Sequence, residues 1–507
     1  MELAALAGDI SRSASDVIAL GAAFPEDLDI RHRTGVTLVA HGFFDEAEAQ
    51  FRAALAIRPR FCFSELELGN ICLRRGALDD AAHWFDVAIA SEPCFALAHV
   101  AAGKLAMSRG QHLRALLYLE SANIFWSASQ EVLSDYVEML VYHNRRYQAA
   151  SAFVHASTLR KLDLGEARRL MSLLAETGRY AEVLAIYTSL AIRDGHGGDQ
   201  VVVAIQAHAK LALSFSKDNV IMEAAAQEKS PAWLNSPAVH DNIRRAIESR
   251  APFSVVRLYD GEARFVVATA APAPQRLLDT ERFVIGDEVW RNWFGHSIAD
   301  IPQSQLAALH ASLLRAIGNA DILGVPTAER LIADSYHFGY LAFLARRLAD
   351  DGIRAASASV SDAFLSMNLH RDDRFYARLL SGLDWIGVIS PHHGLASSLA
   401  AHLGIPHALD FVIPGERQLP RHILATTLQS HFPDRFHELM STLELPHQGA
   451  VVLVAAGLLG KIYCEKIKSL GGIAIDIGSV ADGWMGFNTR VGQLDDTAFW
   501  RLPSLPP

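Results

Sequence analysis

The sequence predicts an α-solenoid of repeated helix pairs followed by a Rossmann-like, mostly parallel α/β domain. Two observations carry this prediction. Residues 28–197 are self-similar at a step of 34 residues, which is the length of one helix pair in several stacked-repeat proteins. From Asp241 onward, short apolar segments of strand character alternate with helical segments. This alternation is typical of a parallel sheet that is covered by helices on both faces.

The repeat signature consists of small and bulky residues at fixed positions. A glycine or asparagine recurs at each step, a small residue follows five positions later, and a bulky one four positions after that. These positions are Gly42, Gly76, Gly110, Asn144 and Gly178; Ala47, Ala81, Ala115, Ala149 and Val183; and Phe51, Phe85, Leu119, Phe153 and Tyr187. This is the pattern of tetratricopeptide repeats, and it predicts five units. Units four and five lack the early glycine and the closing proline, so we expect them to be irregular.

The ends of these patterns define the expected domains. Residues 1–27 form a capping segment, 28–215 the repeats with a sealing helix, 216–240 a polar linker with prolines, 241–490 the α/β domain and 491–507 a tail. The concave face of such an array binds peptides or proteins. It therefore predicts recognition of a protein or glycan acceptor, while a role in capping or dimerising the second half stays open.

Strands are expected where short apolar runs end in turn-forming residues. They are Phe253–Leu258, Ala320–Val325, Ala355–Val360, Ala363–Leu365, Asp384–Ile389, Val451–Ala455 and Ile473–Ile477. Helices are expected between them, among them Asn242–Arg250, Tyr336–Ala349 and Leu458–Ser469.

Composition excludes some classes of function. The formal net charge of −10 argues against non-specific binding of nucleic acid, which needs a basic face. No apolar run approaches the ~18–20 residues of a membrane span, and the amino terminus lacks the basic region of a secretory signal. The four cysteines show no C-x-x-C spacing. We therefore expect a cytoplasmic protein without a membrane span.

The strand predicted at Phe253–Leu258 leads directly into Asp260-Gly261-Glu262. In open α/β folds, ligands bind at the carboxyl ends of the strands. Two carboxylates one residue apart are hard oxygen ligands that suit Mn²⁺ or Mg²⁺ held against a diphosphate. Asp260 and Glu262 are therefore the candidate metal ligands and catalytic residues. The alternative is an ordinary Asp-Gly turn followed by a solvated glutamate.

Two stretches resemble the GT-D glycosyltransferases, a bacterial family once catalogued as a domain of unknown function. Residues 254–262 read S-V-V-R-L-Y-D-G-E, which is similar to the family's opening motif S-[IV]-x-R-[FY]-G-D-G-E. Residues 451–461 and 471–479 resemble its closing strand, glycine turn, helix and D-[IV]-G segment. The resemblance implies a glycosyltransferase that uses a nucleotide sugar and ties its D-x-E to the metal. Two positions depart from the family: Tyr259 replaces a glycine, and Ser479 replaces a common histidine.

Further candidates for substrate binding stand near the same strand. Arg257 can brace the carboxylates or reach a phosphate, with a structural ion pair as the alternative. Tyr259 and Gly261 flank Asp260. His392 and His393 precede a helix, whose amino terminus favours anions, but exposed polar histidines are the alternative.

The last candidates lie in the closing segment. Gly457 and Gly460 allow close packing or close approach of a ligand. Asp476 can orient sugar hydroxyls or act as a base, or it can simply cap the turn at Gly478. The stretch 455–460 lacks the first glycine of a dinucleotide fingerprint, which weakens an NAD- or S-adenosylmethionine-dependent alternative.

The sequence thus predicts a metal-assisted glycosyltransferase whose repeats present the acceptor. The competing hypothesis is a repeat scaffold with a catalytically inactive nucleotide-binding-like domain.

Overall fold

The computed structural model describes residues 10–350, 353, 358–366, 375–416 and 430–487. The chain divides into two compact units, Met1–Leu173 and Leu174–Pro507, and each unit is described by itself. The expected tail at 491–507 and part of the expected capping segment at 1–27 lie outside the described residues.

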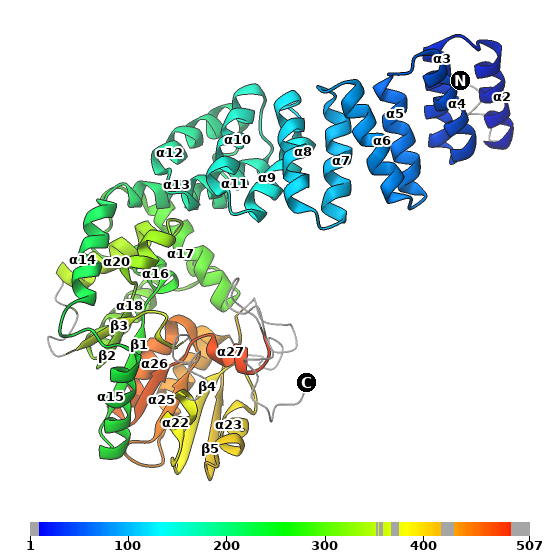
Figure 1. The fold of residues 1–507 in the computed structure, drawn as a ribbon. Coiled ribbons are helices and arrows are strands. Elements are labelled where there is room, and N and C mark those ends of the chain that lie inside the picture. Colours follow the sequence, from blue (N-terminus) through cyan, green and yellow to red (C-terminus); the bar gives the residue numbers. More distant parts are fainter. Residues whose placement is uncertain (1–9, 351–352, 354–357, 367–374, 417–429, 488–507) are drawn as a thin grey trace. The chain divides into compact units, whose positions relative to one another are not determined.

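Paired helices form the first unit and the beginning of the second (Figure 1). Both helices of every pair begin at steps of 34 residues, as the sequence predicts. The first helices are α3 (Leu28–Ala40), α5 (Cys62–Arg74), α7 (Ala96–Ser108), α9 (Gln130–Tyr142) and α11 (Leu164–Glu176). The second helices are α4 (Phe44–Ile57), α6 (Leu78–Ser91), α8 (His112–Phe125), α10 (Arg146–Leu159) and α12 (Tyr180–Ser189). A further helix, α2 (Ile10–Ala23), precedes them.

The repeat signature has a direct physical cause. The glycine that follows each first helix has a left-handed backbone, for example φ +83° at Gly42, and Asn144 adopts φ +57° in the fourth unit. Asparagine is one of the few other residues that tolerate this conformation. A Cβ on Gly35 would lie 2.5 Å from the Phe51 ring, so the early glycine makes room for the bulky residue of its own unit.

The later units are more regular than the sequence suggests. Unit four keeps the helix boundaries of the first three, so the expected irregularity is wrong for unit four. Unit five departs only at its end, where α12 continues as a π-helical turn at Leu190–Asp194. Asn144 replaces glycine without loss of the turn, and this explains why the unit survives its degenerate sequence.

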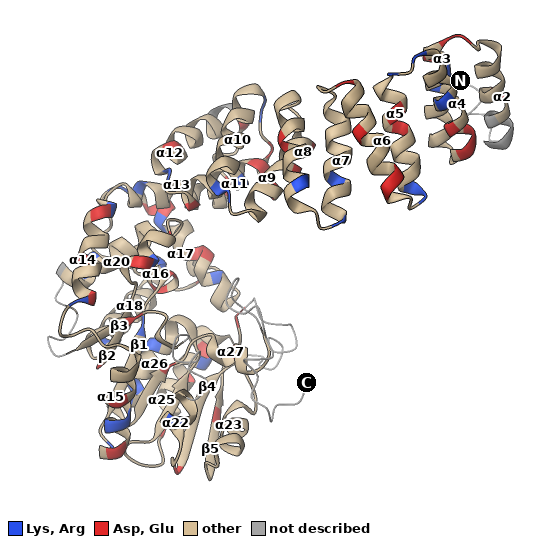
Figure 2. Ribbon diagram, viewed as in Figure 1, with Lys and Arg blue, Asp and Glu red and all other residues tan. Residues whose placement is uncertain are grey.

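Charges of both signs are interspersed along the repeat helices (Figure 2). Some of them form the same ion pair in successive units: Arg75 contacts Asp45, and Arg109 contacts Asp79 one repeat later. Such exposed pairs add little to stability, but their recurrence shows that neighbouring units stack alike. None of the helices that the structure describes combines the length and apolar character of a membrane span.

The second unit begins inside the region that the sequence assigns to the repeats. Helix α13 (Gln200–Ala212) packs against α17 (Asp279–Phe294) and α20 (Phe338–Asp350). The expected linker at 216–240 instead contains α14 (Lys217–Glu228) and the start of α15 (Ser236–Ser249). The polar, proline-bearing sequence of this stretch marks helix ends and caps: Ser216 and Asn235 cap α14 and α15.

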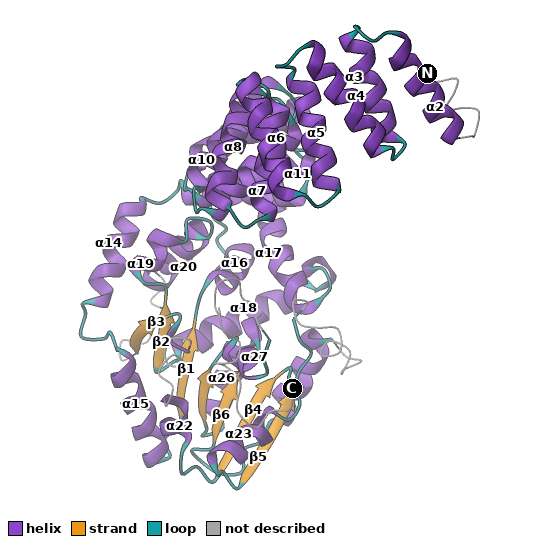
Figure 3. Cartoon of the chain, turned by 45° about the vertical axis from the view of Figure 1, so that its right-hand side comes forward, coloured by secondary structure: helices purple, strands orange, loops and turns teal. Residues whose placement is uncertain are grey.

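A seven-stranded parallel sheet is the centre of the second unit (Figure 3). Its strands lie in the order β3-β2-β1-β7-β6-β4-β5. They are β1 (Phe253–Arg257), β2 (Ile322–Val325), β3 (Ser359–Asp362), β4 (Trp385–Ser390), β5 (His407–Val412), β6 (Val451–Val454) and β7 (Ile473–Asp476). This confirms the predicted fold class. Strand β5 was not predicted, the expected strand at 363–365 begins as a turn, and part of the expected strand at 355–360 lies outside the described residues.

Helices cover both faces of the sheet. On one face, α15, α22 (Phe375–Leu380), α23 (Leu395–Leu403) and α27 (Val480–Trp484) share a buried core with alternate strand residues. On the other face, α26 (Gly457–Ser469) packs on β1, β6 and β7 and against α18 (Gln303–Gly318). From β1 the chain continues to β2 and β3, which lie on one side of β1. The last strand, β7, pairs with β1 on its other side. The neighbours β1 and β7 therefore form the switch point at which open α/β sheets bind ligands.

Acid should destabilise the second unit through two buried histidines. Burial lowers the pKa of His208 to about 3 and that of His431 to about 3, from an ordinary value of 6.5. Between these values the unfolded chain binds protons that the folded chain excludes, so the free energy of unfolding falls as the pH falls below 6.5. At pH 5 each histidine should cost about 2 kcal/mol.

Thermal melts of the second unit at pH 7 and pH 5 check this. His208→Gln keeps an acceptor for the Gly339 backbone N–H, which donates to His208 Nε2 at 3.0 Å, and should reduce the dependence on pH by about half. The exposed His402→Gln is the control. Equal pH dependence in His208→Gln and the native chain would show that His208 is not a source of the instability in acid.

A fragment of residues 174–507 should fold on its own, whereas one of residues 236–507 should not. The shorter fragment lacks α12–α14, including His208 and Tyr180, whose hydroxyl donates to the Ser335 carbonyl at 2.6 Å. It therefore exposes the apolar surface of α17 and α20 that α13 covers. Circular dichroism and cooperative melting of both fragments measure the difference. A well-folded 236–507 fragment would show that the domain boundary lies in the linker predicted from the sequence.

Candidate functional site

Two helix amino termini meet the switch point of the sheet. Helix α16 (Asp260–Thr269) begins three residues after β1, and α26 begins three residues after β6. Trp293 lies against both termini: a Cβ on Gly261 would lie 2.5 Å from its ring, and one on Gly457 would lie 3.4 Å from its Nε1. Gly457 has φ +52°. Both glycines therefore serve close packing around this indole, which is buried.

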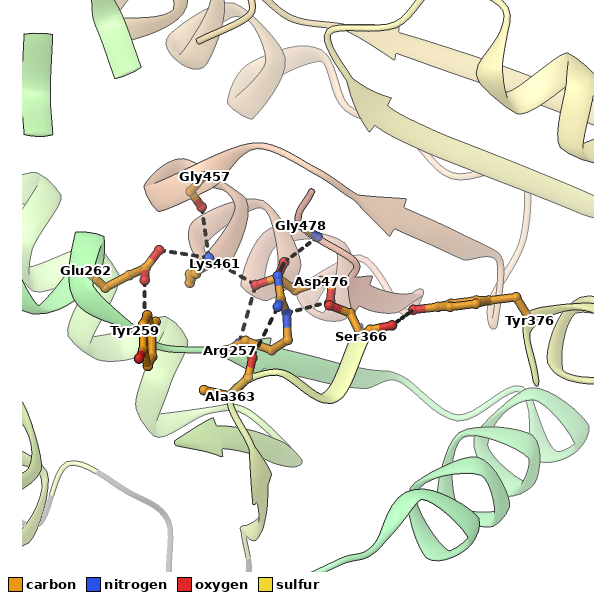
Figure 4. A network of polar contacts seen from close by, with 10 residues as sticks. All are labelled: Arg257, Tyr259, Glu262, Ala363, Ser366, Tyr376, Gly457, Lys461, Asp476 and Gly478. Atoms are coloured by element: carbon orange, nitrogen blue, oxygen red, sulfur yellow. Dashed lines mark hydrogen bonds and ion pairs between the residues drawn. The ribbon is translucent and has the colours of Figure 1, made fainter. Parts of the chain in front are cut away.

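Lys461 lies below these termini in a buried ionic network (Figure 4). Its Nζ is 2.9 Å from Glu262 Oε1 and 3.0 Å from Asp476 Oδ2, and it donates to the Gly457 carbonyl at 3.0 Å. The lysine thus links the first turn of α16, the end of β7 and the first turn of its own helix. Each of the three ammonium protons has an acceptor, so the positive charge of Lys461 is balanced by groups of the protein itself.

Arg257 completes the network from β1. Its Nη2 lies 3.1 Å from Asp476 Oδ1, its Nε donates to the Asp476 carbonyl at 3.1 Å, and its Nη1 donates to the Ala363 carbonyl at 3.2 Å. A Cβ on Gly478 would collide with the same guanidinium, and the Gly478 N–H donates to Asp476 Oδ1 at 3.1 Å. Of the two sequence interpretations of Arg257, the geometry fits the structural ion pair.

The network fixes the protonation of its members. Burial alone would raise the pKa of Asp476, but the charges of Arg257 and Lys461 outweigh burial and hold that pKa below its ordinary value. Burial opposes the charge of Lys461 likewise, and Asp476 and Glu262 raise its pKa. Asp476 is 3% exposed and engaged on both oxygens. The structure therefore does not support the expectation that Asp476 acts as a base or orients a sugar; it caps the Gly478 turn, the alternative interpretation.

Glu262 does not fit the predicted two-carboxylate metal site. One of its oxygens faces Lys461, and the other accepts the Tyr259 backbone N–H at 3.0 Å as part of a capping box. The side chain is buried. A cation shared with Asp260 would have to displace or approach an ammonium group 2.9 Å away. The sequence could not reveal this, because the lysine lies 199 residues further along the chain (461 − 262).

Asp260 belongs to a different, partly exposed cluster. Its Oδ2 lies 3.7 Å from His337 Nε2, and its side chain is 35% exposed. On the opposite side of the imidazole, His337 Nδ1 lies 2.9 Å from Asp334 Oδ2. The Tyr259 hydroxyl donates to the same Asp334 oxygen at 2.7 Å. The cluster thus joins the start of α16 to the segment between α19 (Ala328–Ala333) and α20.

The two histidines of the β4 loop have different environments. His392 is buried, its Nε2 lies 2.7 Å from Asp482 Oδ1, and its ring stacks on Phe487. It ties the loop to α27, so the structure does not bring its side chain to an open surface where it could touch a diphosphate. His393 is exposed. A Cβ on Gly460 would lie 3.3 Å from Val454 Cγ1, which accounts for that glycine by helix packing alone.

One hollow among the described residues lies at the other edge of the sheet. It encloses about 400 Å³ beside the amino ends of β1, β2 and β3, where Asp321 and Lys468 form an ion pair at 2.7 Å. Asp260 is at the carboxyl edge, so this hollow does not contain it. In the described part of the chain, no group of three His, Cys, Asp or Glu side chains is arranged to hold a metal ion.

Four residues that organise this edge are not predicted from the sequence. They are Trp293, Asp334, His337 and Lys461. Lys461 carries a readable signal, because it is the one charged residue in the apolar run 451–464, and a buried lysine needs carboxylate partners. Asp334 and His337 stand three residues apart at the start of a helix, but nothing in the sequence shows that this turn faces Asp260.

Comparison with known families assigns the α/β half. Residues 234–484 match the model of the GT-D fold-like domain. The chain therefore carries a GT-D-like domain over these residues, with tetratricopeptide-type repeats at its amino-terminal end. The resemblance noted in the sequence is confirmed. The curated proteins include no match.

Several solved structures match part of the chain. MamA is 17% identical, covers 30% of this chain and 90% of its own, and has a TM-score of 0.27. YrrB, described as a TPR protein with an unusual peptide-binding site, is 17% identical, covers 31% and 81%, and has a TM-score of 0.26. Pseudomonas aeruginosa pilF is 16% identical, covers 40% and 90%, and has a TM-score of 0.28. Similarity at this level adds nothing to what the helix boundaries already establish.

Proposed function

We propose that the protein is a glycosyltransferase that moves a sugar from a nucleotide sugar to a protein or glycan acceptor recognised by its repeats. The observation that carries the proposal is the GT-D-like match over residues 234–484. It covers the sheet whose switch point presents Asp260 and two helix amino termini. Backbone N–H groups at such termini carry partial positive charge, which suits the phosphates of a nucleotide.

The chain's own residues would act at this edge in distinct ways. Asp260 is the open carboxylate of the D-x-E motif and would hold a divalent cation, Mn²⁺ or Mg²⁺. When bound, such a cation stabilises negative charge on a leaving diphosphate. Gly261 and Gly457 keep the termini of α16 and α26 close to Trp293. The Lys461 network orients α16 and α26 on the sheet without itself contacting substrate.

A panel of sugar nucleotides tests the donor. Binding to the folded state raises the free energy of unfolding by RT ln(1 + [L]/Kd), which is about 2.7 kcal/mol at 100-fold excess over Kd. We expect one class of sugar nucleotide to raise the melting temperature and to be hydrolysed slowly when Mn²⁺ or Mg²⁺ is added. If no member of the panel binds or is hydrolysed, the proposal fails.

The second candidate is a repeat scaffold whose α/β domain binds a nucleotide without turning it over. The observation that favours it is the engagement of Glu262 by Lys461, which removes one carboxylate of the motif from the open edge. The same panel separates the two functions. A scaffold raises the melting temperature with nucleotide but releases no free sugar.

A stripe of exposed apolar side chains on α8 is our candidate contact for the acceptor. Leu113, Leu117 and Ile124 are 60%, 59% and 68% exposed, and spacings of four and seven residues place them on one helix face. Replacing all three with glutamate should abolish transfer to the natural acceptor and leave hydrolysis of the donor unchanged, because the stripe is in the first unit, away from Asp260 along the chain.

Transfer and hydrolysis are measured side by side in the full chain. Leu159→Glu, an exposed apolar position on α10, is the control and should keep both activities. Undiminished transfer by the triple variant would show that the acceptor binds elsewhere.

A further inference from the structure

The imidazole of His337 is held so that one nitrogen faces Asp260. Its backbone N–H and its Nδ1 both approach Asp334, at 3.1 Å from Oδ1 and 2.9 Å from Oδ2. The backbone N–H can only donate, so Asp334 accepts in that contact. The direction of the Nδ1 hydrogen bond follows from the other contacts of Asp334.

Asp334 accepts from other donors as well as facing the imidazole. Its Oδ1 accepts the His337 backbone N–H at 3.1 Å, and its Oδ2 accepts the Tyr259 hydroxyl at 2.7 Å. The same two oxygens lie 3.0 and 2.9 Å from His337 Nδ1. Because both carboxylate oxygens act as acceptors, Nδ1 is the donor in this contact, and the lone pair of the neutral imidazole is on Nε2.

Two acceptors then face each other across a short gap. Nε2 lies 3.7 Å from Asp260 Oδ2, which is too long for a hydrogen bond. Two ligand atoms bonded to one ion at about 2.1 Å can be up to ~4.2 Å apart, so the gap fits a shared cation. Both side chains are open to solvent, at 35% exposure for Asp260 and 23% for His337.

The hydrogen bond on the other side of the imidazole is also the one that a metal-binding histidine usually makes. A histidine ligand usually donates its other ring N–H to a carboxylate, which fixes the tautomer and strengthens the ligand. Asp334 makes this contact here. The nearby Arg264 is paired with Glu288 at 2.8 Å, so its charge is balanced inside the protein. Glu262, by contrast, already balances Lys461.

We propose that Asp260 and His337, and not Asp260 and Glu262, hold the divalent cation, with Asp334 as the residue that positions the imidazole. This inference rests on the proposed function, because a nucleotide diphosphate would supply the remaining ligands. A mixed nitrogen and oxygen pair favours Mn²⁺ over Mg²⁺, which is bound mainly through oxygen. Two protein ligands bind weakly alone, so the diphosphate should strengthen the binding of Mn²⁺.

Pulsed electron paramagnetic resonance of the full chain with Mn²⁺ and inorganic diphosphate tests this directly. We expect a modulation from a directly bound ¹⁴N nucleus, and its replacement by a ¹⁵N signal when all histidines are ¹⁵N-labelled. This measurement needs no variant. His337→Gln should lose the modulation and at least tenfold in Mn²⁺ affinity, and Asp334→Asn should lose about 10- to 100-fold. The exposed His402→Gln is the matched control and should keep both.

Three results would overturn the proposal: bound Mn²⁺ without histidine nitrogen coupling, coupling that survives in His337→Gln, or no Mn²⁺ bound in the presence of diphosphate. Two further results distinguish failure of the cation site from failure of the proposed glycosyltransferase function. Sugar nucleotides that bind and react in excess EDTA would keep that function and refute the cation site. Histidine-coupled Mn²⁺ without any binding of sugar nucleotides would keep the cation site and refute the function.

Discussion

Replacing Asp260 with asparagine is expected to lower metal-dependent turnover of the sugar nucleotide by at least ~100-fold. The substitution preserves size and removes the charge that a divalent cation needs, and one well-placed electrostatic contact is worth about this much in a transition state. The melting temperature should change little, because the side chain is partly exposed and has one long contact, to His337 at 3.7 Å.

Asp279→Asn is the matched control. Asp279 is also the first residue of a helix, α17, and is 94% exposed, so it reports the effect of losing a negative charge at a helix start. It should keep full turnover. Unchanged turnover in Asp260→Asn would remove this motif from the catalytic machinery and favour the scaffold function.

Replacing Lys461 with methionine is expected to lower the free energy of unfolding of the second unit by about 3–5 kcal/mol. Removing one partner of a buried ion pair leaves charges without compensation. Here Glu262 loses its ammonium partner, while Asp476 keeps its contact with Arg257. Denaturant melts measure the loss. Glu262→Gln in the same background should restore part of it, since the stranded carboxylate becomes neutral.

The control for this variant is Lys468→Met on the same helix. Lys468 pairs with Asp321 at 2.7 Å, but the two side chains are 24% and 32% exposed, and partly exposed pairs are worth about 1 kcal/mol or less. Equal losses in both lysine variants would mean that the network does not stabilise the fold in the way its burial indicates.

The architecture could be predicted from the sequence because its signals are local. The 34-residue register depends on a turn, a small residue and a bulky residue within one helix pair, and each unit repeats the same physics. The central strands also have a local signal. Both of their faces are covered by helices, so each strand is a short continuous apolar run. Strand β5 was missed because it is at the sheet edge, where its exposed and half-buried residues alternate and the run lacks a continuous apolar character.

The site could be predicted only in part, because its chemistry depends on contacts between distant segments. The sequence identifies Asp260, which lies at the open edge, but treats Glu262 as its equivalent. Residues two positions apart on a helix do not face each other, and Glu262 turns back to cap α16 and meets Lys461. The role of Glu262 is therefore structural, and its replacement is expected to lower stability. The boundary near residue 216 failed similarly, because nothing local distinguishes a helix that seals a repeat from one that packs on α17 and α20.

The segment that carries His337 is held by helices that the sequence assigns to the repeats and to the linker. Tyr180 of α12 and Lys217 of α14 bond Ser335, and His208 of α13 bonds Gly339. Evolution can therefore lengthen or shorten the array in whole units upstream of α11, since each unit begins and ends at equivalent positions. An exchange of arrays between relatives, however, must leave α12–α14 with the α/β half. Natural hybrids and designed chimaeras alike have their usable crossover point before residue 174, not at the end of the visible repeat pattern.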